Sequence, residues 1–351
     1  MKSLTKPVAI FVALAVALLA LVLLIQVSAD ATLILLDVLI VLLLLPLFIL
    51  SCFAWLYARW PSVRPRRFRL PLAAVSTVVL LVVSWQVAIA LLDSGLEGRG
   101  YDGIYKDCHK VWATRGLVLD APVDDHTAGN SIASIALAFE RGARGAEVDV
   151  FYDPTLARYV VSHNFPYDQK NGELLSLEKL FRSIGGGHFY WLDFKHMRHL
   201  DDGAIVDATS RLVEIVDSLG MEKESIYVEG ATPFHLAHFH DAGFRTIFDI
   251  QPLSDGHFMT PIVVNLYKAI FYFGDFSVLG MNYAYRGEPI YGPMTRQLLG
   301  DIPVFIYHIP DDVELLRELS ALPEVRVLLD HDHGADRYGI SACEGKSNRQ
   351  D

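Results

Sequence analysis

Three long apolar runs fill the first quarter of the chain and constrain its fold more than any other feature. They cover about residues 7–28, 31–57 and 70–92. Each run reaches the roughly 20 residues that a helix needs to cross a bilayer. Core helices of water-soluble proteins are rarely this long and this free of charge. The sequence therefore predicts an N-terminal bundle of three transmembrane helices in residues 1–92.

Basic residues between the runs predict the orientation of this integral membrane protein. The linker 59–69 carries five arginines, and Lys2 and Lys6 precede the first run. Because basic loops stay in the cytoplasm, we expect a cytoplasmic N-terminus and an extracytoplasmic domain (periplasmic, extracellular or lumenal) after Leu92. The triplet 27–29 resembles a signal-peptidase site. Cleavage there would remove the first span and leave the C-terminal domain on the same side.

Charge and cysteine content narrow the partners of the rest of the chain. Net charge is −11 over 351 residues, but residues 1–92 carry +5 and the remainder −16. A nucleic-acid partner is not expected, because binding to phosphates needs a basic surface. Cys108 and Cys343 fall near the two ends of the exported domain. A disulfide between them is one expectation for an oxidising compartment, and two free thiols are the other.

Short apolar strands alternate with amphipathic helical patterns over residues 108–343, which follow a linker at 93–107 and precede a disordered tail at 344–351. Strands separated by helices indicate a parallel sheet. The predicted strands are 116–120, 145–151, 158–162, 189–194, 225–229, 246–250, 277–281, 303–307 and 325–329. Eight strands and an extra one near 160 favour an α/β fold of the (β/α)8 TIM barrel type, with a doubly wound open sheet as the alternative. No G-x-G-x-x-G follows a strand, so no nucleotide cofactor is expected.

Acidic residues gather at the ends of two of these strands. Glu147 and Asp149 are two residues apart and so share one face of a strand, and Asp193 and Lys195 share a face at the end of the next main strand. Neighbouring carboxylates repel unless a cation or a proton lies between them. A divalent cation with oxygen ligands, Mg²⁺ or Ca²⁺, is the simplest interpretation. His163 ends the extra strand between them.

The order of these residues resembles the glycerophosphodiester phosphodiesterases and the spider-venom-type phospholipases D, of the phospholipase-C-like phosphodiesterase superfamily. The segments GARGAEVDVFYD, YVVSHN and FYWLDFK carry the resemblance, which covers most of residues 108–335. It implies a (β/α)8 barrel that cleaves phosphodiesters with a divalent metal. The resemblance implies that Glu147, Asp149 and Asp193 are metal ligands. It also implies that His163 is a catalytic histidine and that Lys195 faces the phosphate.

Weaker matches add substrate-binding positions. Asn282 in GMNY and Tyr307 in VFIYHIPDD resemble pocket residues, although the family commonly has Trp where Tyr307 falls. Asp330 matches the aspartate that ends the last strand.

The first catalytic histidine is where the chain departs from the glycerophosphodiester pattern. That pattern begins His-Arg-Gly, whereas this chain has Thr114 before Arg115 and Gly116. In DDHTAGNS, however, His126 closely precedes Asn130, which resembles the venom-type arrangement. We therefore expect His126 to be the first catalytic histidine. The alternative is that Thr114 fills that position and catalysis is impaired.

The expected function is a membrane-anchored, metal-dependent phosphodiesterase that cleaves glycerophosphodiesters or phospholipid headgroups by histidine acid/base catalysis. A tether at the membrane favours a lipid-derived phosphodiester substrate. The apolar stretch 258–273 is either a buried barrel helix or an element that enters the membrane interface. The alternatives are a different metal-dependent barrel hydrolase, and a catalytically degenerate barrel that acts as a membrane-tethered binding or scaffold protein.

Overall fold

The computed structural model describes residues 69–118, 129–170, 172–330 and 335–343. The predictions for residues 7–28, 31–57, His126 and 344–351 lie outside these ranges. The chain divides into two compact units, Met1–Asp93 and Ser94–Asp351. Helix α4 (Arg69–Glu97) covers the run at 70–92. Within the described ranges, no helix has the combination of length and apolarity that identifies a membrane span.

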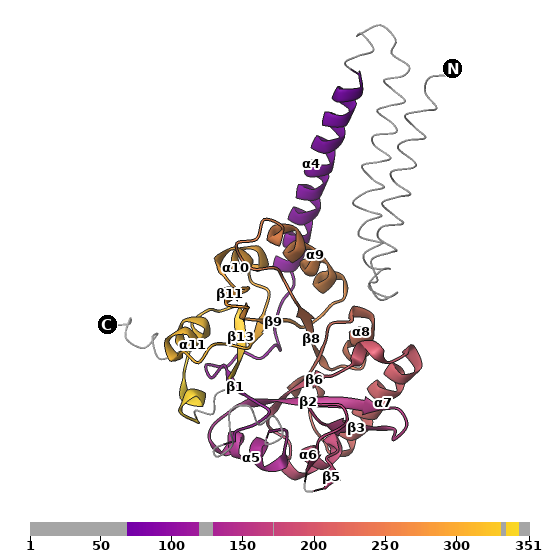
Figure 1. Cartoon of the computed structure of the whole chain (residues 1–351), viewed down its shortest axis with the longest axis vertical. Coiled ribbons are helices and arrows are strands. Elements are labelled where there is room, and N and C mark those ends of the chain that lie inside the picture. Colours follow the sequence, from indigo (N-terminus) through magenta and orange to yellow (C-terminus); the bar gives the residue numbers. More distant parts are fainter. Residues whose placement is uncertain (1–68, 119–128, 171, 331–334, 344–351) are drawn as a thin grey trace. The chain divides into compact units, whose positions relative to one another are not determined.

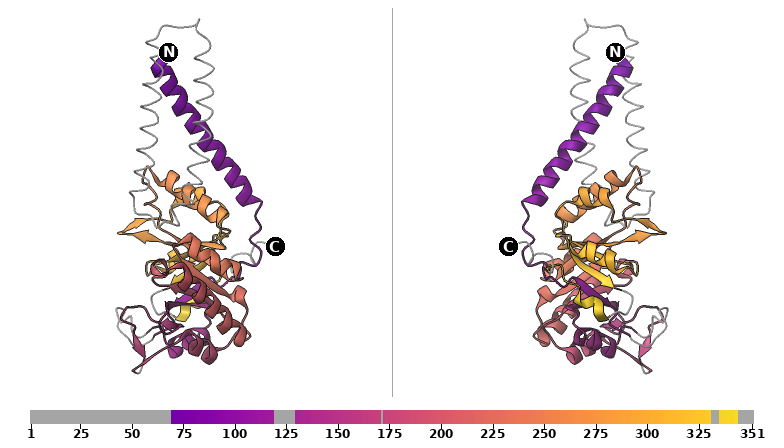
Figure 2. Two further views of the ribbon diagram at one scale, coloured as in Figure 1. Left: turned by 90° about the vertical axis from the view of Figure 1, so that its right-hand side faces the viewer. Right: turned by 90° about the vertical axis from the view of Figure 1, so that its left-hand side faces the viewer.

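A closed barrel of parallel strands forms the second unit, as the sequence predicts. In the described chain its eight strands are β1 (Val111–Thr114), β2 (Gly145–Asp153), β6 (Phe189–Phe194), β7 (Ile226–Gly230), β8 (Arg245–Ile250), β9 (Val278–Asn282), β12 (Val304–Tyr307) and β13 (Val325–Asp330). Each strand pairs with the next in this order, and β1 pairs with both β2 and β13. Figure 2 shows the first and last strands, in purple and yellow, side by side where the barrel closes. The open sheet is thereby excluded.

Helices surround the strands (Figure 1). They are α5 (Ile132–Glu140), α6 (Leu177–Ile184), α7 (Asp202–Ser218), α8 (Pro233–Asp241), α9 (Thr260–Phe273), α10 (Pro293–Leu299) and α11 (Val313–Ser320). Side-chain oxygens that accept backbone N–H groups begin α5, α6, α7 and α11, at Ser131, Ser176, Asp201 and Asp312. Short elements fill the connections: β3 (Arg158–Val161), β4 (Gln169–Lys170), β5 (Glu173–Leu174), β10 (Ala284–Tyr285), β11 (Glu288–Pro289) and the 3₁₀ turns η3 (Met197–His199), η4 (Lys223–Ser225) and η5 (Ala335–Gly339).

Helix α9 forms within the apolar stretch 258–273. It buries one face, which includes Val264 and Phe271, and this burial agrees with a barrel helix. Phe258 and Phe273, just before and at the end of the helix, are 82% and 68% exposed.

The first strand lies five residues earlier than predicted. The sequence predicts a strand at 116–120, but β1 ends at Thr114 because Arg115 and Gly116 adopt left-handed backbone angles, with φ of 57° and 86°. A Cβ at Gly116 would lie 2.5 Å from the carbonyl carbon of Ser134, so only glycine fits. This turn directs the chain against the start of α5, where Leu117 N donates to Ser134 O at 2.8 Å.

The barrel interior is built in layers. A buried, largely aromatic layer includes Trp112, Trp191, Tyr227, Ile247 and Phe305, one from each of five strands. Side chains two residues further along a strand point to the same face. On these five strands those residues are Thr114, Asp193, Glu229, Asp249 and Tyr307. A polar layer therefore lies directly above the aromatic one, toward the carboxyl ends of the strands.

Cys108 and Cys343 form a disulfide, with their Cα atoms 5.5 Å apart. The alternative of two free thiols is thus wrong. The bond joins the segment before β1 to the segment after η5 and spans 235 residues of sequence.

Candidate active site

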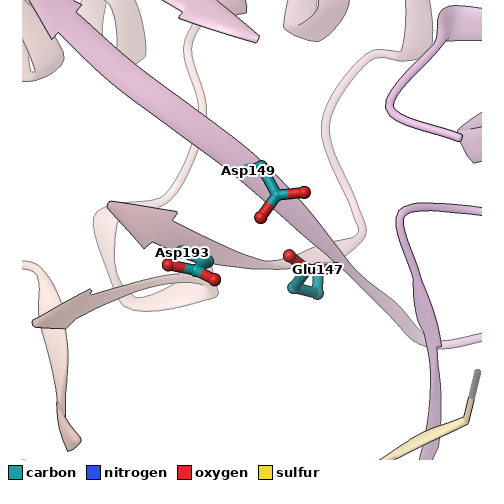
Figure 3. A group of neighbouring side chains, drawn as sticks. All are labelled: Glu147, Asp149 and Asp193. Carbon is teal, nitrogen blue, oxygen red and sulfur yellow. The ribbon is translucent and has the colours of Figure 1, made fainter. Parts of the chain in front are cut away.

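Three carboxylates converge at the carboxyl ends of β2 and β6. Glu147 and Asp149 lie on β2 and Asp193 on β6, where Asp149 and Asp193 are paired in register. Figure 3 shows the three side chains gathered between the two strands. One oxygen from each lies within 4.8 Å of the others. Glu147 and Asp149 are 4% and 1% exposed, so water screens their repulsion little.

This geometry fits a divalent cation. Oxygen ligands lie 2.0–2.6 Å from Mg²⁺ or Ca²⁺, so two ligands of one ion are at most about 5 Å apart. The carboxylates satisfy that limit. When Glu147, Asp149 and Asp193 are ionised, the single charge of Lys195 leaves the cluster at −2, which a divalent cation balances. Carboxylate oxygens also favour these hard cations over softer metals.

The carboxyl groups differ in how readily they ionise. Burial and the neighbouring charges of Asp149 and Asp193 raise the pKa of Glu147 well above its usual range. Burial also raises the pKa of Asp193 to about 6, although Lys195 acts in the opposite direction. Burial opposes ionisation of Asp149 too, but the hydrogen bond from His163 and the charge of Lys195 outweigh it and lower its pKa. Of the three, Asp149 is therefore the carboxylate that ionises most readily without a metal.

Lys195 and His163 both contact Asp149. Lys195 Nζ lies 2.7 Å from Asp149 Oδ1 and also contacts Asp193 Oδ2. Burial lowers the pKa of Lys195, but its three acidic neighbours outweigh burial and raise it above the usual range. His163 Nδ1 lies 3.0 Å from Asp149 Oδ2. The structure thus brings together five of the six residues predicted as metal ligands or catalytic groups, and the sixth, His126, lies outside the described residues.

Asn130 and the turn after β1 hold the carboxylates in place, which the sequence analysis missed. Asn130 is fully buried, and its amide contacts both the side chain and the backbone N–H of Asp149. Arg115 N donates to Glu147 Oε2 at 2.9 Å. Asp168 orients the loop that carries His163, because it accepts from His163 N at 3.0 Å.

Two further acids lie in the polar layer and were also missed. Trp191 Nε1 donates to Glu229 Oε2 at 2.6 Å, and Tyr307 Oη donates to Asp249 Oδ1 at 2.7 Å. Burial and the charges of Asp193 and Asp249 raise the pKa of Glu229 well above its usual range. Burial raises the pKa of Asp249 to about 7, while the bond from Tyr307 acts against this. Glu229 lies two residues after the buried Tyr227, and Asp249 lies two residues after the buried Ile247. This spacing along the strands is the sequence signal that would have identified both acids.

The two predicted pocket residues, Asn282 and Tyr307, are the last residues of strands on the other side of the barrel. Asn282 ends β9 and pairs in register with Tyr307 of β12. Its side-chain oxygen contacts the ring of His308, which has a left-handed backbone with φ of 51°. Burial lowers the pKa of His308, and the charges of Lys195 and Arg115 lower it further. His308 is thus a second imidazole at this end of the barrel, missed although it follows a predicted strand directly.

Thr114 and Asp330 end the two strands at the barrel seam. Thr114, which directly precedes Arg115, pairs in register with Glu147. Its buried hydroxyl makes no hydrogen bond within the described ranges. Asp330 Oδ1 accepts from Arg337 Nη1 at 2.8 Å, and Arg337 also contacts Asp311. Asp330 is therefore held by an arginine from η5.

Fold and site together define a (β/α)8 barrel with an acidic cluster, able to hold a metal, at the carboxyl ends of its strands. No family model matches the chain, and no curated protein matches it.

Solved structures similar to this chain include glycerophosphodiester phosphodiesterases, the family that the sequence resembles. One is a candidate member from Galdieria sulphuraria, with 16% identity and a TM-score of 0.49 over 65% of this chain and 96% of that one. Another, from Thermotoga maritima, has 16% identity and a TM-score of 0.45 over 63% and 93%. A phosphodiesterase from Oleispira antarctica, in complex with the product sn-glycerol-3-phosphate, has 12% identity and a TM-score of 0.47 over 66% and 96%.

Proposed function

We propose that this chain is a metal-dependent phosphodiesterase that cleaves glycerophosphodiesters or phospholipid headgroups. The convergence of Glu147, Asp149 and Asp193 with Lys195 and His163 carries the proposal. Negative charge increases on the phosphate oxygens as a phosphodiester is cleaved, and a divalent cation and an ammonium group stabilise it. The imidazole supplies proton transfer.

Each chain residue has a distinct part in this chemistry. A bound Mg²⁺ or Ca²⁺ supplies Lewis-acid stabilisation of a phosphate oxygen, and Glu147, Asp149 and Asp193 would hold it. Lys195 stays protonated because its pKa is raised, so it offers a permanent positive charge to the phosphate.

His163 moves the proton. Asp149 is ionised and accepts a hydrogen bond, so Nδ1 of His163 carries the hydrogen in their 3.0 Å contact. Nε2 is then the nitrogen that exchanges a proton with the attacking hydroxyl or the leaving alkoxide. We propose His126 as the second imidazole, in line with the sequence resemblance. His308 is a further imidazole at this end of the barrel among the described residues.

Hydrolysis of defined diesters tests the proposal. The purified full chain is incubated with glycerophosphocholine, lysophosphatidylcholine or sphingomyelin, with Mg²⁺, Ca²⁺ or EDTA, and products are followed by phosphorus NMR. We expect cleavage of at least one diester that EDTA abolishes and that His163→Ala removes. A folded chain that binds neither cation and cleaves none of the three would contradict the proposal.

A second candidate is a degenerate barrel that acts as a membrane-tethered binding or scaffold protein. The presence of Thr114 directly before Arg115 and Gly116, where the family pattern has histidine, favours it. Binding of a diester without cleavage, in the presence of a bound cation, would support this candidate over the enzyme.

We also propose that the chain is membrane-anchored, with the barrel on the extracytoplasmic side. The apolar runs and the arginine-rich linker support the orientation, and the Cys108–Cys343 bond supports an oxidising compartment. In intact cells, external protease should cleave a tag placed after Asp351 but not one placed before Met1. Protection of the C-terminal tag would contradict the orientation.

A further inference from the structure

A cavity of about 480 Å³ lies at the opposite end of the barrel from the carboxylates. Its lining includes residues just before strands: His109 before β1, Arg144 before β2 and His188 before β6. Asp149 and Asp193 are the fifth residues of β2 and β6, toward their carboxyl ends. The cavity is therefore separate from the candidate active site.

Two arginines make this cavity attractive to an anion. Arg141 and Arg144 line it, and neither forms an ion pair with an acidic side chain in the part of the chain that the structure describes. Asp107 also lines it, where its Oδ1 accepts from the backbone N–H of His109 at 2.8 Å and its negative charge acts on Arg144. One carboxylate therefore offsets part of the charge of the two guanidinium groups. The two guanidinium groups thus form a local excess of positive charge, although residues 93–351 as a whole have a net charge of −16. Guanidinium groups bind phosphate through paired, charge-assisted hydrogen bonds.

An aromatic wall lies beside the arginines. The rings of Phe139 and His188 stack in parallel, with centroids 3.8 Å apart and planes 4° apart. Tyr338 adds a buried ring. The last carbonyl groups of α5 accept hydrogen bonds from the backbone N–H groups of residues 141–143, so this helix end adds little negative potential of its own. The volume suits a small organic ligand and exceeds what one phosphate group fills.

The disulfide fixes two walls of the cavity. Asp107 and His109 flank Cys108, while Tyr338 and Gly339 lie shortly before Cys343. Ala342 N donates to Cys108 O at 2.9 Å beside this bond. The cavity is therefore bounded by segments that are covalently joined.

We propose that this cavity binds a small organic phosphate monoester. Arg141 and Arg144 bind the phosphate group, and the planar or apolar part of the ligand contacts the stacked rings of Phe139 and His188 and the ring of Tyr338. The site requires neither the carboxylate cluster nor a metal.

Isothermal titration with adenosine 5′-monophosphate tests the proposal. The full chain is titrated in EDTA, so that the carboxylate cluster holds no cation. We expect one bound ligand per chain, with inorganic phosphate weaker and adenosine weaker still. Arg141→Gln and Arg144→Gln should each weaken binding about tenfold, because each removes a charge-assisted hydrogen bond. Arg317→Gln, an exposed arginine of α11 paired with Glu314, should leave affinity unchanged.

Three results would overturn the proposal. They are absence of binding to the unmodified chain, affinity in both arginine variants equal to that of the unmodified chain, or loss of binding in Asp193→Asn with full binding in the arginine variants. The last result would place the ligand at the carboxylate cluster. Arg141 and Arg144 are exposed, so both variants should fold, and unchanged circular dichroism checks this. Failure of the phosphodiesterase assay leaves this test unaffected, because no turnover is measured.

Discussion

Asn130 holds Asp149 with both ends of its side-chain amide: Nδ2 donates to Asp149 Oδ2 at 2.6 Å, and Oδ1 accepts from Asp149 N at 3.0 Å. The pair is buried, so little else can orient this carboxylate on the Asn130 side. Residues that position metal ligands in this way typically change metal affinity 10–100-fold when removed.

Asn130→Gly should therefore weaken Mg²⁺ or Ca²⁺ binding by about 10–100-fold, measured by titration calorimetry. Glycine suits the left-handed backbone at this position, where φ is 52°, so the loss comes from the amide. Ala157→Gly is the matched control, because Ala157 has φ of 47° in an exposed turn. Equal affinity in the two variants would refute the positioning role.

Glu147→Gln removes one charge of the cluster with little change in shape. Without metal we expect no loss of stability, because burial already disfavours the ionised form of Glu147. The stabilisation that added cation gives, about 2.7 kcal/mol at a hundredfold excess over Kd, should disappear. Thermal unfolding with and without Mg²⁺ or Ca²⁺ measures this, with exposed Glu314→Gln as control. A cation-dependent rise in Tm that survives in Glu147→Gln would mean that the ion binds elsewhere.

The histidines separate by their effect on turnover. His163→Gln and His126→Gln should each lower kcat by about 10²–10⁴-fold while leaving cation affinity within a few-fold. His308→Gln should have a smaller effect. If His308→Gln abolished turnover and His126→Gln did not, the second proton-transfer group would be His308 rather than His126.

Asp249 makes stability depend on pH. Its folded pKa of about 7 lies above the ordinary value of 3.8, so between these values the folded state binds more protons than the unfolded state. Stability from this group is therefore lost as pH rises from about 4 to 7. Asp249→Asn mimics the protonated acid and still accepts from Tyr307. Relative to the unmodified chain in EDTA, this variant should gain stability between pH 5 and pH 8 in denaturant unfolding. A constant difference across that range would argue against the raised pKa, and exposed Asp241→Asn serves as the control.

The intact Cys108–Cys343 bond closes a loop of more than 200 residues in the unfolded chain. Reduction of this bond should therefore lower the free energy of unfolding by about 4–5 kcal/mol. Urea unfolding with and without a reductant measures the change, and Cys343→Ser should reproduce it. Replacement of the third cysteine of the chain, Cys52 in the apolar run 31–57, by serine should not reproduce it. Equal stability of the oxidised and reduced chains would show that the unfolded state gains nothing from release of the loop.

Local pattern was enough to predict most of the barrel. Seven of the eight barrel strands in the described chain lie within two residues of the predicted bounds, because each is a short apolar run between helical patterns. Residues 116–120 were misplaced because Gly116 and Leu117 continue an apolar stretch. The turn at Arg115 depends on contacts with Glu147 and Ser134, which lie far along the chain.

The candidate site divides in the same way. Glu147 and Asp149 share a strand face by simple alternation, and Asp193 with Lys195 repeats it, so their cluster could be predicted. Asn130 could not, because its role depends on which side chain the closed barrel brings to it. Predictions for residues 1–68 and His126 stay untested, since they lie outside the described residues.

The aromatic layer beneath the carboxylates determines how molecules can reach and leave the candidate active site. Trp112, Trp191, Tyr227 and Phe305 are at most 1% exposed and fill the barrel interior ring against ring. This layer closes the barrel interior below the carboxylates. A substrate of the proposed reaction and its products would therefore enter and leave through the same opening, at the carboxyl ends of the strands. A ligand bound in the cavity at the opposite end of the barrel could therefore affect the carboxylate cluster only through a displacement of the barrel strands.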